Sequence, residues 1–122
     1  MAVRGSRHRN FVAYQLAATL ADDVHKTVST WRKFDTWTVG VQLVRAADSI
    51  GANIAEGLGR GTLADQRRFF RIANGSLKET EHWLELASRR GLLGDGRFEP
   101  RTSELGRVLT GLIRADPNVS SG

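Results

Sequence analysis

Cysteine is absent from this sequence of 122 residues. The chain therefore forms no disulfide and no thiolate metal site, and it has no cysteine nucleophile. Long apolar runs are absent as well, because no uncharged stretch approaches the ~20 residues that a membrane span requires. No apolar block of the signal-peptide type follows the N-terminus. These absences predict a cytoplasmic protein with no membrane partner.

Strand-like alternation, internal repeats and low-complexity tracts are also missing from the sequence. Apolar residues instead recur every three or four positions, which is the spacing of an α-helix. The length suits one domain with a buried core. The sequence thus predicts an all-α protein, an up-and-down antiparallel four-helix bundle with short connections.

Caps and glycines predict where these helices begin and end. We expect helices over residues 10–30, 36–57, 62–90 and 101–114. Asn10 is a candidate N-cap of the first helix, Asp35 or Thr36 of the second, and Thr62 of the third, which Gly91 ends. The predicted organisation is a basic N-terminal arm (residues 1–10), the bundle (residues 11–114) and a flexible C-terminal tail (residues 115–122).

Close packing is expected between the second and third helices. Small residues on the second helix let another helix approach: Ala46, Ala47, Gly51, Ala52 and Ala55. Apolar side chains of the third helix, among them Ile72 and Trp83, cover an arc of roughly 160° when projected at 100° per residue. This arc is wider than one bundle seam requires, so we expect another subunit to cover part of it.

Three polar residues of the second helix, Ser49, Asn53 and Glu56, lie on nearly one face. They could form a polar ligand site. The preferred interpretation is a hydrogen-bonded network that pins the helix hairpin, with Glu56 accepting from backbone N–H groups of the turn that follows.

Gly57, Gly59 and Gly61 form that turn, and Gly57 is expected to end the helix at a positive φ. A glycine-rich turn before a helix can hold a phosphate. Here no strand precedes the turn and no Gly-Lys-Ser/Thr follows it, which argues against a nucleotide-binding P-loop. Helix capping is the expected role, although Arg60 could still meet an RNA phosphate there.

Two carboxylate–histidine pairs have the spacing of di-iron ligands in bundles: Glu79 with His82, and Asp22 with His25. Both pairs project away from the core stripes, so we expect neither a metal site nor a cofactor. No Ser-His-Asp order or poised carboxylate pair is recognisable. The sequence therefore predicts a protein without enzymatic activity.

The charge balance is basic, with 18 Lys and Arg residues against 13 Asp and Glu residues and a net charge of +5. Most of the cations are Arg, whose guanidinium forks onto phosphate, although codon bias toward Arg is an alternative explanation.

A basic stripe runs along the third helix, where Arg67, Arg71 and Lys78 fall within about 40° of one another in projection. Cations in the first turns oppose the helix macrodipole by ~0.3–1 kcal/mol each, so stability does not require them. The stripe is either a solvated charged face or a nucleic-acid surface repeated around an oligomer. The candidate nucleic-acid-binding residues are Arg45, Arg60, Arg67, Arg68, Arg71 and Lys78.

These motifs resemble the bacterial four helix bundle protein family. The family includes proteins encoded in intervening sequences of large-subunit ribosomal RNA genes and the accessory variability protein of diversity-generating retroelements. The resemblance rests on residues 42–47 (QLVRAA), 49–60 (SIGANIAEGLGR) and 69–79 (FFRIANGSLKE), and it covers residues 11–114. The chain departs from the family pattern at Gly51, where Pro is usual, and at Leu58, where an aromatic residue is usual.

The resemblance implies a four-helix bundle that assembles as a ring-shaped homopentamer. The retroelement member of the family looks like a basic scaffold that binds nucleic acid and a reverse transcriptase. Residues and resemblance together predict a homo-oligomer whose basic face binds RNA or DNA without strong sequence preference. The partners that the resemblance suggests are a reverse transcriptase or a ribosomal RNA intervening sequence. The alternative is a protein–protein interaction scaffold with no physiological nucleic-acid role.

Overall fold

The computed structural model describes the backbone of residues 2–94 and 98–115, and the side chains from residue 8 onward within these ranges. This part of the chain is almost entirely helical and contains no strand. Its elements are α1 (Ala2–Val28), α2 (Lys33–Asp35), the π-helical turn η1 (Thr36–Gly40), α3 (Val41–Leu58), α4 (Leu63–Arg89) and α5 (Glu99–Arg114).

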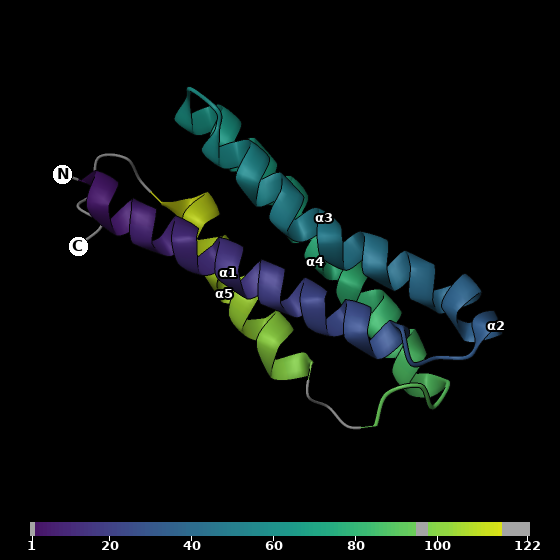
Figure 1. Cartoon of the computed structure of the whole chain (residues 1–122). Helices are drawn as coiled ribbons and strands as arrows, with labels where there is room; N and C mark the ends of the chain where they lie inside the picture. Colours follow the sequence, from purple (N-terminus) through teal and green to yellow (C-terminus); the bar gives the residue numbers. More distant parts are fainter. Residues whose placement is uncertain (1, 95–97, 116–122) are drawn as a thin grey trace.

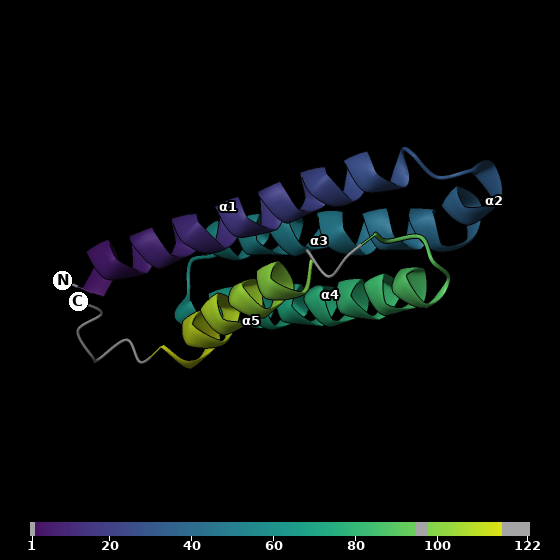
Figure 2. The same ribbon diagram turned by 90° about the horizontal axis from the view of Figure 1, so that it is seen from below.

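Four long helices result, because α2, η1 and α3 follow one another without a break. The junction residues Thr36 and Val41 both have right-handed helical φ and ψ angles. Successive helices run antiparallel (Figures 1 and 2), α3 packs on both α1 and α4, and α5 closes the bundle against α4 and α1. The prediction of an all-α up-and-down four-helix bundle is confirmed.

The core follows the helical stripes that the sequence predicts. Its largest fully buried side chains include Leu20, Val24, Leu43, Ile50, Ile54, Leu77, Leu105 and Leu109. Burying each such side chain stabilises the fold by roughly 1.5–3 kcal/mol. The buried hydroxyl of Thr80 donates to the Ser76 carbonyl oxygen at 2.8 Å, so this polar group leaves no unsatisfied donor in the core.

Two helix starts differ from the sequence prediction. The backbone of α1 is helical from Ala2, so Asn10 lies inside the helix and is not its N-cap. Residues 2–10 contain no Pro, and their three Arg residues are good helix formers. The second long helix begins after Arg32, whose backbone is extended (φ −66°, ψ 159°), so neither Asp35 nor Thr36 is its cap.

Both predicted ends of α4 are confirmed. The Thr62 side chain caps the helix by accepting from the Asp65 backbone N–H at 3.2 Å. At the other end Gly91 has φ +72°, and the N–H groups of Gly91 and Leu92 donate to the carbonyls of Ser88 and Ala87 at 3.1 and 2.9 Å. These two bonds are the Schellman pattern that satisfies the last carbonyls of a helix.

Gly57 has a different role from the one predicted. It does not end α3, which continues to Leu58, and its φ is not positive. A Cβ added at Gly57 would lie 3.0 Å from Phe70 Cε1, 3.1 Å from Phe69 Cβ and 3.2 Å from the Gln66 carbonyl oxygen. The absence of a side chain therefore lets α3 approach α4 closely.

The other small residues of α3 and the apolar arc of α4 divide between core and surface. Ala46 and Ala47 are buried, whereas Ala52 and Ala55 are exposed to solvent. On α4, Trp83 is half-buried and Ile72 remains 42% exposed. The single chain thus leaves a flank of the arc uncovered.

None of the helices in the described residues combines the length with the apolar character needed to cross a membrane.

Candidate nucleic-acid interface

Ion pairing divides the six candidate cations into two groups. Arg60 pairs with Glu56 at 3.0 Å, Arg68 with Asp65 at 3.6 Å and Lys78 with Glu81 at 3.3 Å. Within the part of the chain that the structure describes, Arg45, Arg67 and Arg71 form no ion pair. The unpaired positive charge of α4 is therefore concentrated on two residues.

Sequence spacing explains why Arg67 and Arg71 are unpaired. Positions three and four residues away, where a helix brings side chains together, hold only apolar, small, amide or arginine residues. The Nε atom of Arg67 is also buried without a hydrogen-bond partner. These two guanidinium groups lie one helical turn apart with no carboxylate to neutralise either of them.

Phe69 organises the basic residues at the start of α4. The guanidinium carbons of Arg60 and Arg68 both lie 4.5 Å from the centre of its ring. Such cation–π contacts contribute about 0.5–1 kcal/mol at exposed sites. Gln66 holds the turn as well, since its Nε2 donates to the Arg60 carbonyl oxygen at 3.2 Å. Both guanidinium groups are thereby held against the ring of Phe69 at the start of α4.

A groove of about 440 Å³ between α4 and α5 extends the basic stripe. Lys78 and Asn74 line one wall, Arg107 and Thr110 line the other, and the α5 residue Gly106 is close enough that an added Cβ would lie 3.5 Å from Leu77 Cδ2. Sequence reasoning missed Arg107. Projecting the fourth helix and placing it antiparallel to the third would have brought Arg107 opposite Lys78.

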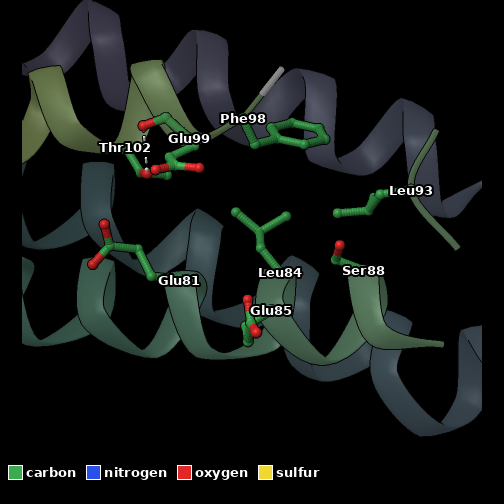
Figure 3. Close-up of a pocket in the computed structure, with 8 residues that line it drawn as sticks. All are labelled: Glu81, Leu84, Glu85, Ser88, Leu93, Phe98, Glu99 and Thr102. Carbon is green, nitrogen blue, oxygen red and sulfur yellow. Dashed lines mark hydrogen bonds between the residues drawn. The ribbon is translucent and has the colours of Figure 1, made fainter. Parts of the chain in front are cut away.

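The same groove becomes acidic toward the other end of α4 (Figure 3). A neighbouring pocket of about 310 Å³ shares Glu81 and Thr102 with the groove. Glu81, Glu85 and Glu99 surround its apolar floor, which is formed by Leu84, Leu93 and Phe98. Positive charge is therefore concentrated at the end of the groove near the start of α4, and negative charge at this pocket.

Arg45 is not part of this surface. It lines a separate pocket with His25 and Val28, between α1 and α3. That pocket is on the side of α3 that faces α1, whereas Lys78 of the stripe lines the groove between α4 and α5. The structure thus places Arg67, Arg68, Arg71 and Lys78 along α4 with Arg60 in the turn beside its start, and it leaves Arg45 elsewhere.

The predicted polar network on α3 is not a link between helices. Ser49 Oγ donates to the Ala46 carbonyl oxygen and Asn53 Nδ2 to the Ser49 carbonyl oxygen, each at 2.8 Å and each within α3. Glu56 pairs with Arg60, while the N–H groups of Gly59 and Arg60 bond to the carbonyls of Glu56 and Gly57. The Ser49 and Asn53 side chains thus satisfy their hydrogen-bond donors on carbonyl oxygens of their own helix.

The carboxylate–histidine pairs form no cluster in the described residues. Glu79 accepts from Trp83 Nε1 at 3.2 Å, and the ring of His82 packs edge-on against Trp83 at 4.8 Å between centres. No group of three His, Cys, Asp or Glu residues in the described ranges is arranged to hold a metal ion.

The sequence profile of the 23S rRNA-intervening sequence protein family matches residues 9–114. The chain belongs to this family. A crystal structure of a protein with unknown function from the S23 ribosomal protein family of Bacteroides thetaiotaomicron VPI-5482 is similar, with a TM-score of 0.78 and 25% sequence identity. The match covers 88% of this chain and 99% of that one. No curated protein matches the chain.

In this member of the intervening-sequence family, the two long motifs lie on the two helices that pack most extensively. Residues 49–60 run along α3 into the turn, and residues 69–79 lie on the facing part of α4. Gly51 is a helical residue facing Ala17 and Tyr14 of α1, and a Cβ there would make ordinary contacts of 3.7 and 3.9 Å. The motifs therefore build the α3–α4 hairpin that carries the basic stripe.

Proposed function

We propose that this protein is a non-enzymatic, homo-oligomeric helical bundle that binds RNA or DNA through the basic stripe of α4. The observation that carries the proposal is the pair Arg67 and Arg71, two guanidinium groups one turn apart without a carboxylate partner. Like charges at this spacing destabilise a helix by a few tenths of a kcal/mol. Phosphate groups remove that repulsion and supply the missing anionic acceptors.

The surroundings of the pair support a phosphate backbone as the ligand. Arg107 faces the stripe across the α4–α5 groove, and Arg60 and Arg68 are held at the start of α4 by Phe69. Closed symmetry would repeat this surface once per subunit. Contacts of this kind position a nucleic acid without reading its sequence. The intervening sequence in the family's name makes structured ribosomal RNA the first probe, and a reverse transcriptase is the protein partner that the resemblance implies.

Binding across a salt series tests the proposal. We expect affinity for structured RNA and for duplex DNA to fall steeply with salt, because each neutralised phosphate contributes about 0.7–0.9 to the log–log slope. The double variant Arg67→Glu/Arg71→Glu should weaken binding to all sequences about equally. Circular dichroism and oligomer mass should stay unchanged, since neither side chain belongs to the core.

The matched control is Arg89→Glu/Arg90→Glu, which makes the same change in charge at the other end of α4. This control should keep most of the duplex affinity. Absence of salt-dependent binding by the wild type, or equal effects of the two double variants, would contradict an α4 interface.

A protein–protein scaffold is the second candidate, and the acidic pocket of Figure 3 favours it. Three glutamates around an apolar floor suit a basic, partly apolar protein segment better than a nucleic acid. This candidate would prevail if the wild type showed no retention of nucleic acid at low ionic strength.

A further inference from the structure

Two aromatic side chains at the end of the bundle opposite the α3–α4 turn are the most exposed large apolar groups of the described residues. Phe34 is 68% exposed and Trp37 is 69% exposed. They are three residues apart on continuous helical backbone, so they lie on the same side of the helix. Neither ring contributes to the core that the rest of the helix builds.

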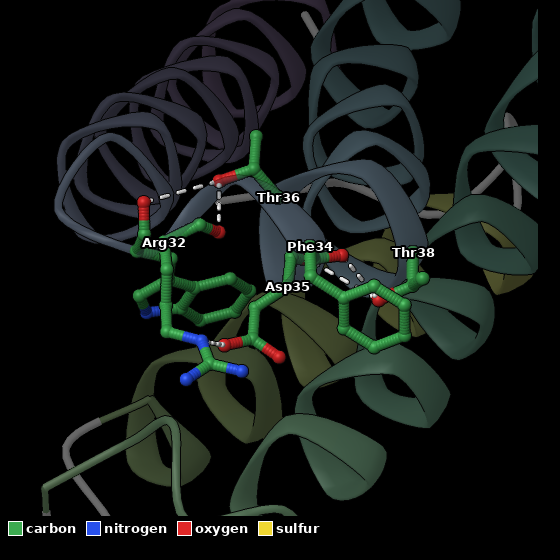
Figure 4. A network of polar contacts seen from close by, with 6 residues as sticks. Arg32, Phe34, Asp35, Thr36 and Thr38 are labelled. Carbon is green, nitrogen blue, oxygen red and sulfur yellow. Dashed lines mark hydrogen bonds and ion pairs between the residues drawn. The ribbon is translucent and has the colours of Figure 1, made fainter.

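Polar contacts hold the backbone around Phe34, one of the two rings (Figure 4). Thr36 Oγ1 donates to the Arg32 carbonyl oxygen at 3.2 Å, and Thr38 Oγ1 donates to the Phe34 carbonyl oxygen at 2.9 Å. Arg32 Nε lies 3.4 Å from Asp35 Oδ2. The two threonine hydroxyls thus bond to carbonyl oxygens around the π-helical turn. Single π-helical turns are frequent at functional sites. The backbone that carries the two rings is thus fixed before any ligand binds, which lowers the entropic cost of binding.

Gly40 lets this turn pack closely against the end of α1. A Cβ at Gly40 would lie 2.6 Å from Val28 Cγ1 and 3.5 Å from Trp31 Cε3. The glycine therefore lets η1 press against the end of α1, with Trp31 packed against the core. Phe34 and Trp37 therefore lie on helical backbone packed against α1, and not on a loop.

Size and charge decide what fits the pair. Each aromatic side chain presents about 150–250 Å², so two partly exposed rings fall well short of the ~800 Å² per partner of a stable protein interface. They match the flat faces of one or two nucleobases. Lys33 is exposed beside them and forms no ion pair in the described residues, which supplies a cation for an adjoining phosphate.

We infer that Phe34 and Trp37 form a stacking site for unpaired bases of single-stranded RNA or DNA, with Lys33 contacting the neighbouring phosphate. The inference rests on the proposed nucleic-acid function and deepens it, because it adds a preference for unpaired segments. Stacking on aromatic rings tolerates any base sequence, since every base has a π-face. Fully paired duplexes, whose bases are covered, gain nothing from this site.

The test compares a single-stranded oligonucleotide with the same sequence in a blunt duplex. The double variant Phe34→Ala/Trp37→Ala should lose roughly five- to a hundredfold in affinity for the single strand and keep its duplex affinity. The matched control is Phe11→Ala, which removes a ring that is 62% exposed on α1. This control should bind both probes as the wild type does.

Tryptophan fluorescence supplies a second readout. Single-stranded RNA should quench the emission of the wild type, and Trp37→Phe should lose most of this quenching, whereas Trp83→Phe should keep it. Unchanged single-strand binding by the double variant, while Arg67→Glu/Arg71→Glu still weakens binding, would overturn the stacking site and leave the proposed function standing. A lower oligomer mass of the double variant would also overturn it, because the rings would then be a subunit contact. A wild type that binds neither probe would refute the proposed function itself.

Discussion

Gly57 sets the distance between two helices through the side chain it lacks. Its backbone is ordinary helix, yet atoms of Phe70, Phe69 and Gln66 of α4 lie only 3.0, 3.1 and 3.2 Å from the place where a Cβ would be. Strain at this residue is therefore steric and comes from the neighbouring helix. A Cβ at this position requires these neighbours to shift by a few tenths of an ångström.

We expect Gly57→Ala to destabilise the protein by about 1–3 kcal/mol, because overpacking outweighs the better helix propensity of Ala. Gly57→Val should cost more. Chemical denaturation followed by circular dichroism measures the effect. The matched control is Gly75→Ala in α4, where no heavy atom lies within 4 Å of the added Cβ. This control should gain about 0.5–1 kcal/mol, and equal stability of the two Ala variants would contradict the steric role of Gly57.

Asn53→Leu tests the corrected account of the polar face. The amide of Asn53 bonds only to the Ser49 carbonyl oxygen within α3, and that bond is worth about 1 kcal/mol. Leu replaces the lost bond with apolar burial and better helix propensity. The free energy of unfolding should therefore change by less than about 1 kcal/mol. A loss several times larger, or a changed oligomer mass, would show that Asn53 links helices after all.

At the scale of elements, two candidate N-cap residues differ in how well they predict where a helix begins. Thr62 caps α4 because its side chain reaches an N–H three residues ahead, which is a local geometry. Asp35 carries a similar signal, yet the helix begins two residues earlier, at Lys33, and continues through a π-helical turn. Gly40 at the end of this turn packs closely on Val28 of α1, so a tertiary contact holds the turn in place.

Thr62→Ala should remove the cap of α4 at a cost of about 1 kcal/mol. Thr19→Ala is the matched control, because the Thr19 hydroxyl only donates to the Gln15 carbonyl oxygen within α1. Ala is the better helix former at such an exposed interior position, so this variant should be neutral or slightly stabilised. Thermal unfolding of the two variants separates the effects, and an equal melting temperature would argue against a capping role for Thr62.

At the scale of the whole molecule, the exposed apolar groups and the family resemblance point to assembly. Ile72 on the apolar arc of α4 remains 42% exposed, and Leu58 and Leu63 flank the turn with similar exposure. Closed symmetry would cover the same flank on every subunit. A ring would also place several basic stripes around one axis, which raises affinity for a long polyanion through multivalency.

We therefore expect light scattering combined with size exclusion to give a mass several times 13.4 kDa at micromolar concentration, with a pentamer as the expected species. Ile72→Lys should lower this mass, since it places a charge on the flank that symmetry would bury. Thr19→Ala on α1 should leave it unchanged. A monomer at high concentration would contradict the assembly and remove the repeated nucleic-acid surface with it.

Local patterns in the sequence determined much of this structure. The four helices, their buried stripes, the Thr62 cap and the Gly91 stop follow from helical spacing and end chemistry. The unpaired state of Arg67 and Arg71 follows likewise from the lack of carboxylates three and four residues away. Each of these features depends on neighbours within a few positions along one helix.

Only the tertiary structure decided the features that depend on which helices meet. The role of Gly57 comes from α4, the π-helical turn packs on α1, and Arg107 joins the basic groove because α5 lies antiparallel to α4. Arg45 is excluded from that surface because the packing of α3 on α1 places it in a pocket beside His25 and Val28. Contacts between residues far apart in the chain have no local signature, because they depend on how the helices pack against one another.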